Sequence, residues 1–116
     1  MPSTTKCNSG DVVVVPFMFS DRPVTKRRPC VVVSSERYHD GRQETIVAAV
    51  TSNVDRRLLT GDHLLQDWRA AGLPKPSVVT GILRTVKQPM IIRKLGGLTG
   101  RDRLAVSRAL SDALDL

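Results

Sequence analysis

The sequence predicts a compact, mainly β (α+β) domain in which an antiparallel, barrel-like sheet is closed by one C-terminal helix. Short β-branched, apolar runs recur along the first three quarters of the chain, separated by turn-forming Gly, Pro and Asp. A clear helical periodicity follows only after Gly97. With 116 residues, the chain can bury about two-thirds of its extended surface without disulfides or metals. We therefore expect a polar tail at residues 1–9 and a single domain at residues 10–116.

The first two strands are expected to form a hairpin. Residues 12–19 are an unbroken apolar run after Asp11, so residues 11–19 are expected to form a buried strand that is bent or bulged at Pro16. Residues 20–27 form a polar loop, and the chain then returns through Pro29 into a second strand at residues 30–34.

A basic cluster enters this second strand. Lys26, Arg27 and Arg28 run directly into Pro29, which fixes its own φ and keeps Arg28 out of the α region. The three cations are therefore expected at the end of a loop, anchored to a rigid strand. The alternative interpretation is a solvated surface turn that leads into an edge strand.

The middle of the chain predicts a third strand and irregular segments. Asp40 and Gly41 signal a turn before a strand at residues 44–52, so three strands pair sequentially. Residues 53–61 are expected to form a surface loop. A short strand at residues 63–65 and a turn at residues 68–72 follow.

Three further elements complete the expected sheet. Residues 77–80 and 82–86 are strand-like, and alternation in the second places Arg84 and Leu83 on opposite faces. Residues 90–95 form another apolar element, which ends at a pair of glycines.

The last segment predicts an amphipathic helix. Thr99 is expected at its N-cap with Asp102 three residues later, a variant of the capping box. Apolar residues recur at helical spacing and are expected to face the sheet: Leu104, Ala105, Leu110, Ala113 and Leu114. Four charged residues are expected to face outward: Arg101, Asp102, Arg108 and Asp112.

The charge distribution indicates a polyanionic partner. The net charge is +7, and residues 69–101 contain no Asp or Glu. The cations of this acid-free window are Arg69, Lys75, Arg84, Lys87, Arg93, Lys94 and Arg101. Such a surplus is typical of proteins that bind nucleic acid, although charge that serves solubility is the alternative. Because the chain has few aromatic residues, we expect phosphate contacts and a pocket rather than base-stacking platforms.

Neither a metal site nor a cofactor is expected. Cys7 and Cys30 are far apart in sequence, and His39 and His63 do not cluster with them. This pattern predicts a reduced, cytoplasmic protein. The longest apolar run, residues 12–19, is too short to cross a bilayer, so no membrane partner is expected.

Four segments, in register along nearly the whole chain, resemble the MazF/PemK family of endoribonuclease toxins. They are Gly10-Asp11-Val12, Arg27-Arg28-Pro29, residues 46–52, and Lys75-Pro76-Ser77-Val78-Val79 ahead of residues 82–86. Residues 54–71 match least, and nothing is carried over to them. The resemblance implies a small SH3-like antiparallel β-barrel with a C-terminal helix.

The resemblance also implies an activity. It implies the toxin of a type II toxin-antitoxin system, a homodimeric, metal-independent and sequence-specific endoribonuclease (mRNA interferase) that cleaves single-stranded RNA. The catalytic pair would be Arg28 and Thr51, and the products a 2′,3′-cyclic phosphate and a 5′-hydroxyl. A fixed guanidinium suits the charge that develops on the phosphoryl oxygens, and Thr51 can hydrogen-bond one of them. Arg28 stays protonated, so the group that accepts the 2′-OH proton is left open.

Other polar residues are predicted contacts for RNA. They are Arg22, Lys26, Arg27, Ser52, Asn53, Lys75, Ser77 and Arg84. His39 and His63 are assigned no catalytic role. Solvated charge and ordinary strand or turn chemistry are the alternatives for each of these residues.

Two partners and one alternative function complete the interpretation. A second copy would lengthen the RNA groove, and a cognate acidic antitoxin would lie across residues 22–28 and cover Arg28. The alternative is a non-catalytic toxin or nucleic-acid-binding module of the same fold, such as a gyrase poison. Gyrase poisons resemble one another in a final Trp-Gly-Ile, whereas this sequence ends Leu114-Asp115-Leu116.

Overall fold

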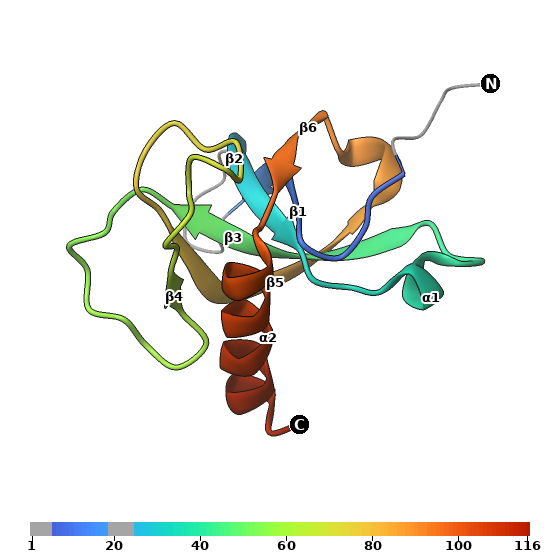
Figure 1. Ribbon diagram of the computed structural model, residues 1–116. Coiled ribbons are helices and arrows are strands. Elements are labelled where there is room, and N and C mark those ends of the chain that lie inside the picture. Colours follow the sequence, from blue (N-terminus) through green and yellow to red (C-terminus); the bar gives the residue numbers. More distant parts are fainter. Residues whose placement is uncertain (1–5, 19–24) are drawn as a thin grey trace.

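The computed structural model describes residues 6–18 and 25–116, which form a six-stranded antiparallel sheet with one long helix packed against it (Figure 1). The strands are β1 (Asp11–Met18), β2 (Thr25–Val32), β3 (Glu44–Thr51), β4 (His63–Leu64), β5 (Val78–Lys87) and β6 (Arg93–Gly97). Two short helices, α1 (Glu36–His39) and η1 (Gln88–Met90), lie between strands, and α2 (Gly100–Leu114) follows β6. The sheet order β4-β5-β3-β2-β1-β6 confirms the predicted mainly β fold with a terminal helix. No helix of the described residues is long and apolar enough to span a membrane.

The first hairpin is confirmed, and its pairing contains no bulge at Pro16. β1 and β2 pair without interruption from Val12↔Val31 to Met18↔Thr25, straight through Pro16. The register shift in β1 lies instead between Val12 and Val13, on the side that pairs with β6.

The second strand begins earlier than predicted, at Thr25 rather than Cys30. The basic cluster therefore lies within β2 and not in a loop. β3 pairs with β2 only from Cys30 onward, so the first half of β2 has one open edge. Pro29, which lacks an N–H, is tolerated at such an edge. Phe19 and residues 20–24 of the predicted loop lie outside the described residues.

The two strand-like segments at residues 77–80 and 82–86 form one strand, β5. Its register with β3 shifts opposite Ala49, and the side chain of Thr80 fills the gap. The Thr80 hydroxyl donates to the Ala49 carbonyl at 2.7 Å and accepts from the Ile82 N–H at 3.2 Å. A buried carbonyl at the bulge is thus satisfied by a side chain.

The sequence predicted neither of the two short helices, α1 and η1. Ser35 caps α1 by accepting from the Tyr38 N–H, and the predicted turn follows, with Gly41 at a φ of +73°. Residues 53–61 are a surface loop and β4 is the predicted short strand.

Each face of the sheet carries its own apolar cluster. The inner face is defined by Val13, Val15, Phe17, Cys30, Val32, Val47, Ala49 and Val86. The outer face is defined by Val12, Val31, Ala48, Val50, Val79 and the α2 residues Val106 and Leu110. Leu83 packs on the outer cluster, and Arg84 lies over Phe17 of the inner cluster. This confirms the prediction that the two side chains lie on opposite faces of the sheet.

The predicted faces of α2 are partly wrong. Leu104 and Leu114 are about half exposed, at 52% and 51%, whereas Asp102 is 1% exposed. Leu110 faces the core as expected, together with Val106. Asp102 is buried because its carboxylate binds the segment after β4 instead of solvent.

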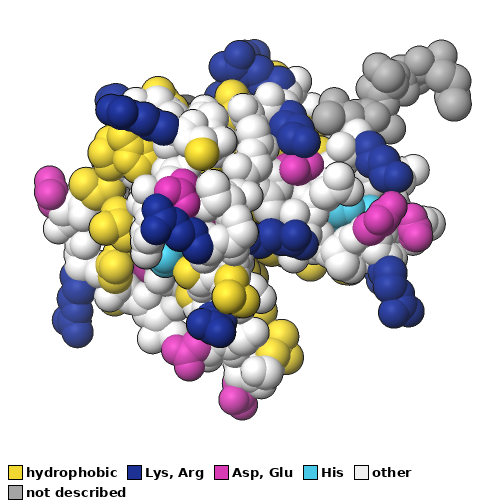
Figure 2. All heavy atoms as spheres, in the orientation of Figure 1, with side chains coloured by type: hydrophobic (Ala, Val, Ile, Leu, Met, Phe, Trp, Pro, Cys, Tyr) yellow, Lys and Arg dark blue, Asp and Glu magenta, His cyan; other side chains and the backbone are white. Residues whose placement is uncertain are grey.

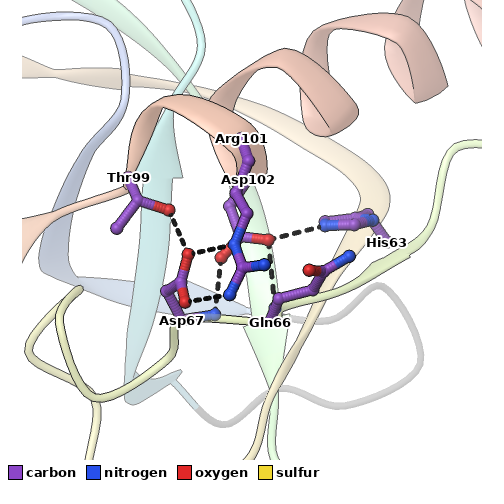
Figure 3. Close-up of polar contacts among 6 residues, drawn as sticks. All are labelled: His63, Gln66, Asp67, Thr99, Arg101 and Asp102. Atoms are coloured by element: carbon purple, nitrogen blue, oxygen red, sulfur yellow. Dashed lines mark hydrogen bonds and ion pairs between the residues drawn. The ribbon is translucent and has the colours of Figure 1, made fainter.

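The capping box is also wrong, although Thr99 does occupy the N-cap. Its hydroxyl donates to Asp67 at 2.6 Å and makes no capping hydrogen bond (Figure 3). Asp102 accepts from the backbone N–H groups of Gln66 and Asp67 at 3.0 and 2.8 Å, and lies 2.9 Å from His63 Nε2. We call His63, Asp67, Thr99, Arg101 and Asp102 the helix-terminus network.

Candidate active site on the inner face of the sheet

Arg28 and Thr51 come from strands that are adjacent in the sheet. The β2–β3 pairing runs from Val32↔Val47 to Cys30↔Ala49, and the same register continued for two residues places Arg28 opposite Thr51. Because side chains two residues apart share a face, both lie on the inner face beyond Cys30 and Ala49. The two predicted catalytic residues therefore lie on the same face of neighbouring strands, just beyond the last pair of the β2–β3 ladder.

The inner face is concave. β1 and β5 are separated by β2 and β3, so in a flat sheet they would lie about 14 Å apart. The Arg84 guanidinium carbon nevertheless lies 5.3 Å from the centre of the Phe17 ring. The sheet is thus curled, as the ribbon in Figure 1 shows. The curl brings the Arg84 side chain of β5 over Phe17 of β1.

Arg28 is half-buried and lies above a neutral thiol. Burial raises the pKa of Cys30 to about 12, against the opposing effect of the nearby Arg28 charge. The Cys30 thiol lies 3.9 Å from the Arg28 carbonyl, toward which it is the donor. Cys30 is therefore a packing residue rather than a nucleophile at neutral pH.

Thr51 is held by the chain that follows it. Its hydroxyl oxygen accepts from the Asn53 N–H at 3.2 Å, which leaves the hydroxyl proton available to donate. Thr51 is half-buried, whereas Ser52 and Asn53 are exposed. A turn of this kind orients the hydroxyl at the strand end.

The basic residues of β2 divide between the two faces. Lys26 is exposed and pairs with Phe17, so it shares the inner face with Arg28. Arg27 is exposed and pairs with Pro16, which places it on the other face. Arg22 lies outside the described residues.

Lys75 and Ser77 lie in the segment before β5. Lys75 is exposed, but Ser77 is 3% exposed and its hydroxyl donates to the Lys75 carbonyl at 2.8 Å. Ser77 thus uses its hydroxyl within the chain. A contact between RNA and any of the eight predicted residues stays a prediction.

Both histidines lie away from the Arg28–Thr51 pair. The ring of His39 is 2.6 Å from the Ser34 hydroxyl, beyond the opposite end of β2. His63 pairs with Val79 of the outer cluster and binds Asp102 of α2, so it lies on the other face. Across residues 6–18 and 25–116, no group of three or more His, Cys, Asp or Glu is arranged to hold a metal ion.

Two of the seven window cations are neutralised by acids from elsewhere. Lys94 pairs with Asp11 at 3.3 Å, and Arg101 pairs with Asp67. In Figure 2, Lys and Arg side chains spread over the visible face, with Asp and Glu beside several of them. Not all seven cations of the acid-free window are therefore uncompensated, because the fold brings acids from outside the window close to two of them.

Phe17 was missed as a residue of this site. It lies on the inner face next to Lys26, and the Arg84 guanidinium packs over its ring. The alternation of Val13, Val15 and Phe17 along the first strand could have placed it there. Its contact with Arg84 depends on the curl of the sheet, which no local pattern reveals.

Comparison with known proteins gives one family and one fold. The profile of the PemK-like, MazF-like toxins of type II toxin-antitoxin systems matches residues 8–114. A search of curated protein sequences found no match.

Solved structures with the same fold include three informative examples. The Mycobacterium tuberculosis toxin MazF-mt6 is 24% identical, with a TM-score of 0.73 over 91% of this chain and 97% of that one. An endoribonuclease in complex with its cognate antitoxin, from a mycobacterial species, is 16% identical, with a TM-score of 0.77 over 96% and 97%. The MazE-MazF complex of Deinococcus radiodurans is 17% identical, with a TM-score of 0.73 over 95% and 97%.

Proposed function

Because the chain belongs to the PemK-like, MazF-like toxins of type II toxin-antitoxin systems, we propose that it is a metal-independent endoribonuclease that cleaves single-stranded RNA at specific sequences. One observation supports the proposal: Arg28 and Thr51 follow the last pair of the β2–β3 ladder on neighbouring strands, and alternation puts both on the inner face. Structures of this fold from mycobacteria are described as endoribonucleases, which supports the same activity here.

The proposed reaction is a transesterification within the RNA. The ribose 2′-oxygen attacks the adjacent phosphorus while the bond from phosphorus to the 5′-oxygen breaks. The 2′-OH loses its proton and the departing 5′-oxygen gains one, so the products are a 2′,3′-cyclic phosphate and a 5′-hydroxyl. Negative charge develops on the non-bridging oxygens during this step.

Arg28 and Thr51 are assigned to that developing charge. A guanidinium presents two parallel N–H donors to a phosphate, and a strand holds it in place before the reaction begins. The Thr51 hydroxyl donates to a non-bridging oxygen while its own oxygen accepts from Asn53.

The test is cleavage of a long, mixed-sequence RNA in EDTA, with both fragment ends mapped. We expect discrete cuts with 5′-hydroxyl and 2′,3′-cyclic phosphate ends. An otherwise identical RNA with a 2′-deoxy sugar at the mapped site should bind but should not be cut there, because the nucleophile is absent. Efficient cleavage of the substituted site would contradict the mechanism.

We also propose that the active species is a homodimer. One protomer of 12.7 kDa offers little concave surface for several nucleotides, and a two-fold pair of inner faces would extend the groove. Light scattering at micromolar concentration should give twice the protomer mass. A stable, active monomer would contradict this part of the proposal.

The second proposed partner is a cognate antitoxin that carries an acidic, flexible segment with apolar anchors. Lys26 and Arg27 are exposed beside the half-buried Arg28, so a polyanion that binds them would also cover the catalytic guanidinium. RNA and antitoxin would then compete for one surface in the cytoplasm. Complexes of similar structures with their antitoxins support such an interaction.

A further inference from the structure

Arg84 is the second arginine of the inner face. It comes from β5, whereas Arg28 comes from β2. Arg84 pairs with Val47, whose side chain belongs to the inner cluster, so both residues point into the concavity. Its guanidinium lies over Phe17, which is 2% exposed. Arg84 is therefore fixed by a buried ring rather than swinging freely in solvent.

Phe17 links Arg84 to the Arg28 region of the inner face. Phe17 pairs with Lys26, and Arg28 is the next β2 residue on the same face, so Phe17 and Arg28 are diagonal neighbours about 7–8 Å apart. With Arg84 stacked over Phe17, both arginines neighbour the same aromatic residue on one concave surface. Such a spacing suits two successive groups of a ligand better than one.

Most donors of Arg84 are available for a ligand. Nη1 donates to the carbonyl of Leu83 at 3.0 Å, and a guanidinium has five N–H groups in all. Within the described part of the chain, Arg84 forms no ion pair with a carboxylate. A half-buried, preorganised and unneutralised arginine is suited to bidentate binding of an anion.

We propose that Arg84 binds the RNA phosphate next to the scissile one, with Phe17 as the platform that positions it. The inference rests on the proposed function, because only cleavage defines a scissile phosphate. The contact between Arg84 and a phosphate is a binding property, which can be measured without cleavage. Arg28 then serves the phosphate that reacts, and Arg84 holds the backbone in line with it. Arg84 is thus a positioning residue for the cleavage.

The experiment measures binding to an RNA that cannot be cut, a single strand with a 2′-deoxy sugar at the mapped site. Arg84→Gln should weaken binding about tenfold, the loss of one charge-assisted contact. It should also reduce the slope of log K against log salt by about 0.7, which corresponds to one phosphate of a single strand. The matched control is Lys87→Gln, an exposed cation of the same strand that alternation places off the inner face.

The platform is tested separately with Phe17→Leu, which keeps an apolar side chain in the core. This variant should bind a few-fold more weakly, because the cation–π contact is lost, while its salt slope stays that of the wild type. Thermal unfolding of every variant shows whether the fold is retained.

A methylphosphonate scan assigns the phosphate. Each linkage of the uncuttable RNA is neutralised in turn, and binding is compared for the wild type and Arg84→Gln. At the linkage next to the scissile one, neutralisation should weaken RNA binding by the wild type but should not weaken binding by Arg84→Gln any further. Effects that add at every linkage, coupling at the scissile linkage, or a variant with the wild-type salt slope would each overturn the proposal.

The same measurements separate this inference from the proposed function. Wild-type protein that binds RNA without cutting it would contradict the endoribonuclease assignment. Coupling between Arg84 and one phosphate would still support Arg84 as a phosphate ligand.

Discussion

The helix-terminus network and the inner face differ in whether their charged side chains are paired. In the network, Asp67 accepts from both Thr99 and Arg101, and Asp102 is surrounded by two backbone N–H groups and His63 (Figure 3). On the inner face, Lys26 and Arg84 form no ion pair with any described carboxylate. The network is internally satisfied, whereas the inner face retains positive charge that a ligand can neutralise.

The difference separates a structural role from a binding role. Satisfied charges tie the start of α2 to the segment after β4, and their loss should affect folding. Unneutralised cations contribute little to folding, since repulsion between them is not offset, and their loss should affect ligands. Variants of the two regions should therefore separate stability from activity.

The largest effect is expected for Arg28→Ala, on activity alone. Turnover should fall about 10²–10³-fold, the usual effect of removing one donor to a developing oxyanion. The free energy of unfolding should change by less than about 1 kcal/mol, because Arg28 lies at the end of a ladder. Cleavage rates and urea unfolding measure the two quantities, and Arg108→Ala on exposed α2 surface is the control. A loss of activity that unfolding fully explains would remove the catalytic assignment.

The next largest effect is expected for Asp102→Ala, on stability alone. Its carboxylate is 1% exposed, so removal leaves two N–H groups and His63 without their acceptor. The free energy of unfolding should fall by about 3 kcal/mol, while cleavage per folded molecule is unchanged. Asp112→Ala, an exposed acid of the same helix, should be nearly neutral. Equal effects of the two substitutions would show that the network contributes no stability.

A smaller effect on the free energy of unfolding is expected when the pH is lowered. The Arg101 and Thr99 hydrogen bonds lower the pKa of Asp67. For Asp102, burial alone would raise the pKa, but the N–H of Gln66, His63 and the N–H of Asp67 lower it overall. Folded carboxyl groups with lowered pKa values contribute stability above the unfolded pKa of about 3.9, and this contribution is lost as pH falls through the folded values. Urea unfolding between pH 6 and 2 should show this loss below about pH 4, and the curve for Asp102→Ala should be flatter than that of the wild type.

The smallest effect concerns the rate at which the antitoxin binds. Because Lys26 and Arg27 are exposed, electrostatic steering should make association slower at high salt, while buried apolar anchors keep dissociation nearly constant. Stopped-flow measurements from roughly 0.05 to 0.5 M salt span a several-fold change in the Debye length. An association rate that ignores ionic strength over this range would argue against the steering.

The sequence predicted the fold where local chemistry decides it. The apolar run from Asp11, the turn at Gly41 and the alternation of Leu83 and Arg84 were all confirmed. The capping box failed because Thr99 and Asp102 bind residues more than thirty positions away, and long-range partners override a local motif.

Only part of the candidate site could be predicted from the sequence. Arg28 and Thr51 were singled out through the family resemblance, and the strand register places them on one face, beyond the last β2–β3 pair. Phe17 under Arg84 could not be predicted, because that contact requires a sheet that curls across two intervening strands. The extent of β2 was also hidden, since Pro29 is compatible with a strand only where the neighbouring ladder has ended.

The position of β6 beside β1 has a consequence during protein synthesis. β1 obtains its second neighbour from residues 93–97, so this ladder closes a loop that spans most of the chain. Such non-local pairing carries a large loop-closure entropy and slows folding. The ribosome must release residues 11–97 before β6 can pair with β1. The nascent chain therefore cannot complete this sheet until residue 97 has left the ribosome.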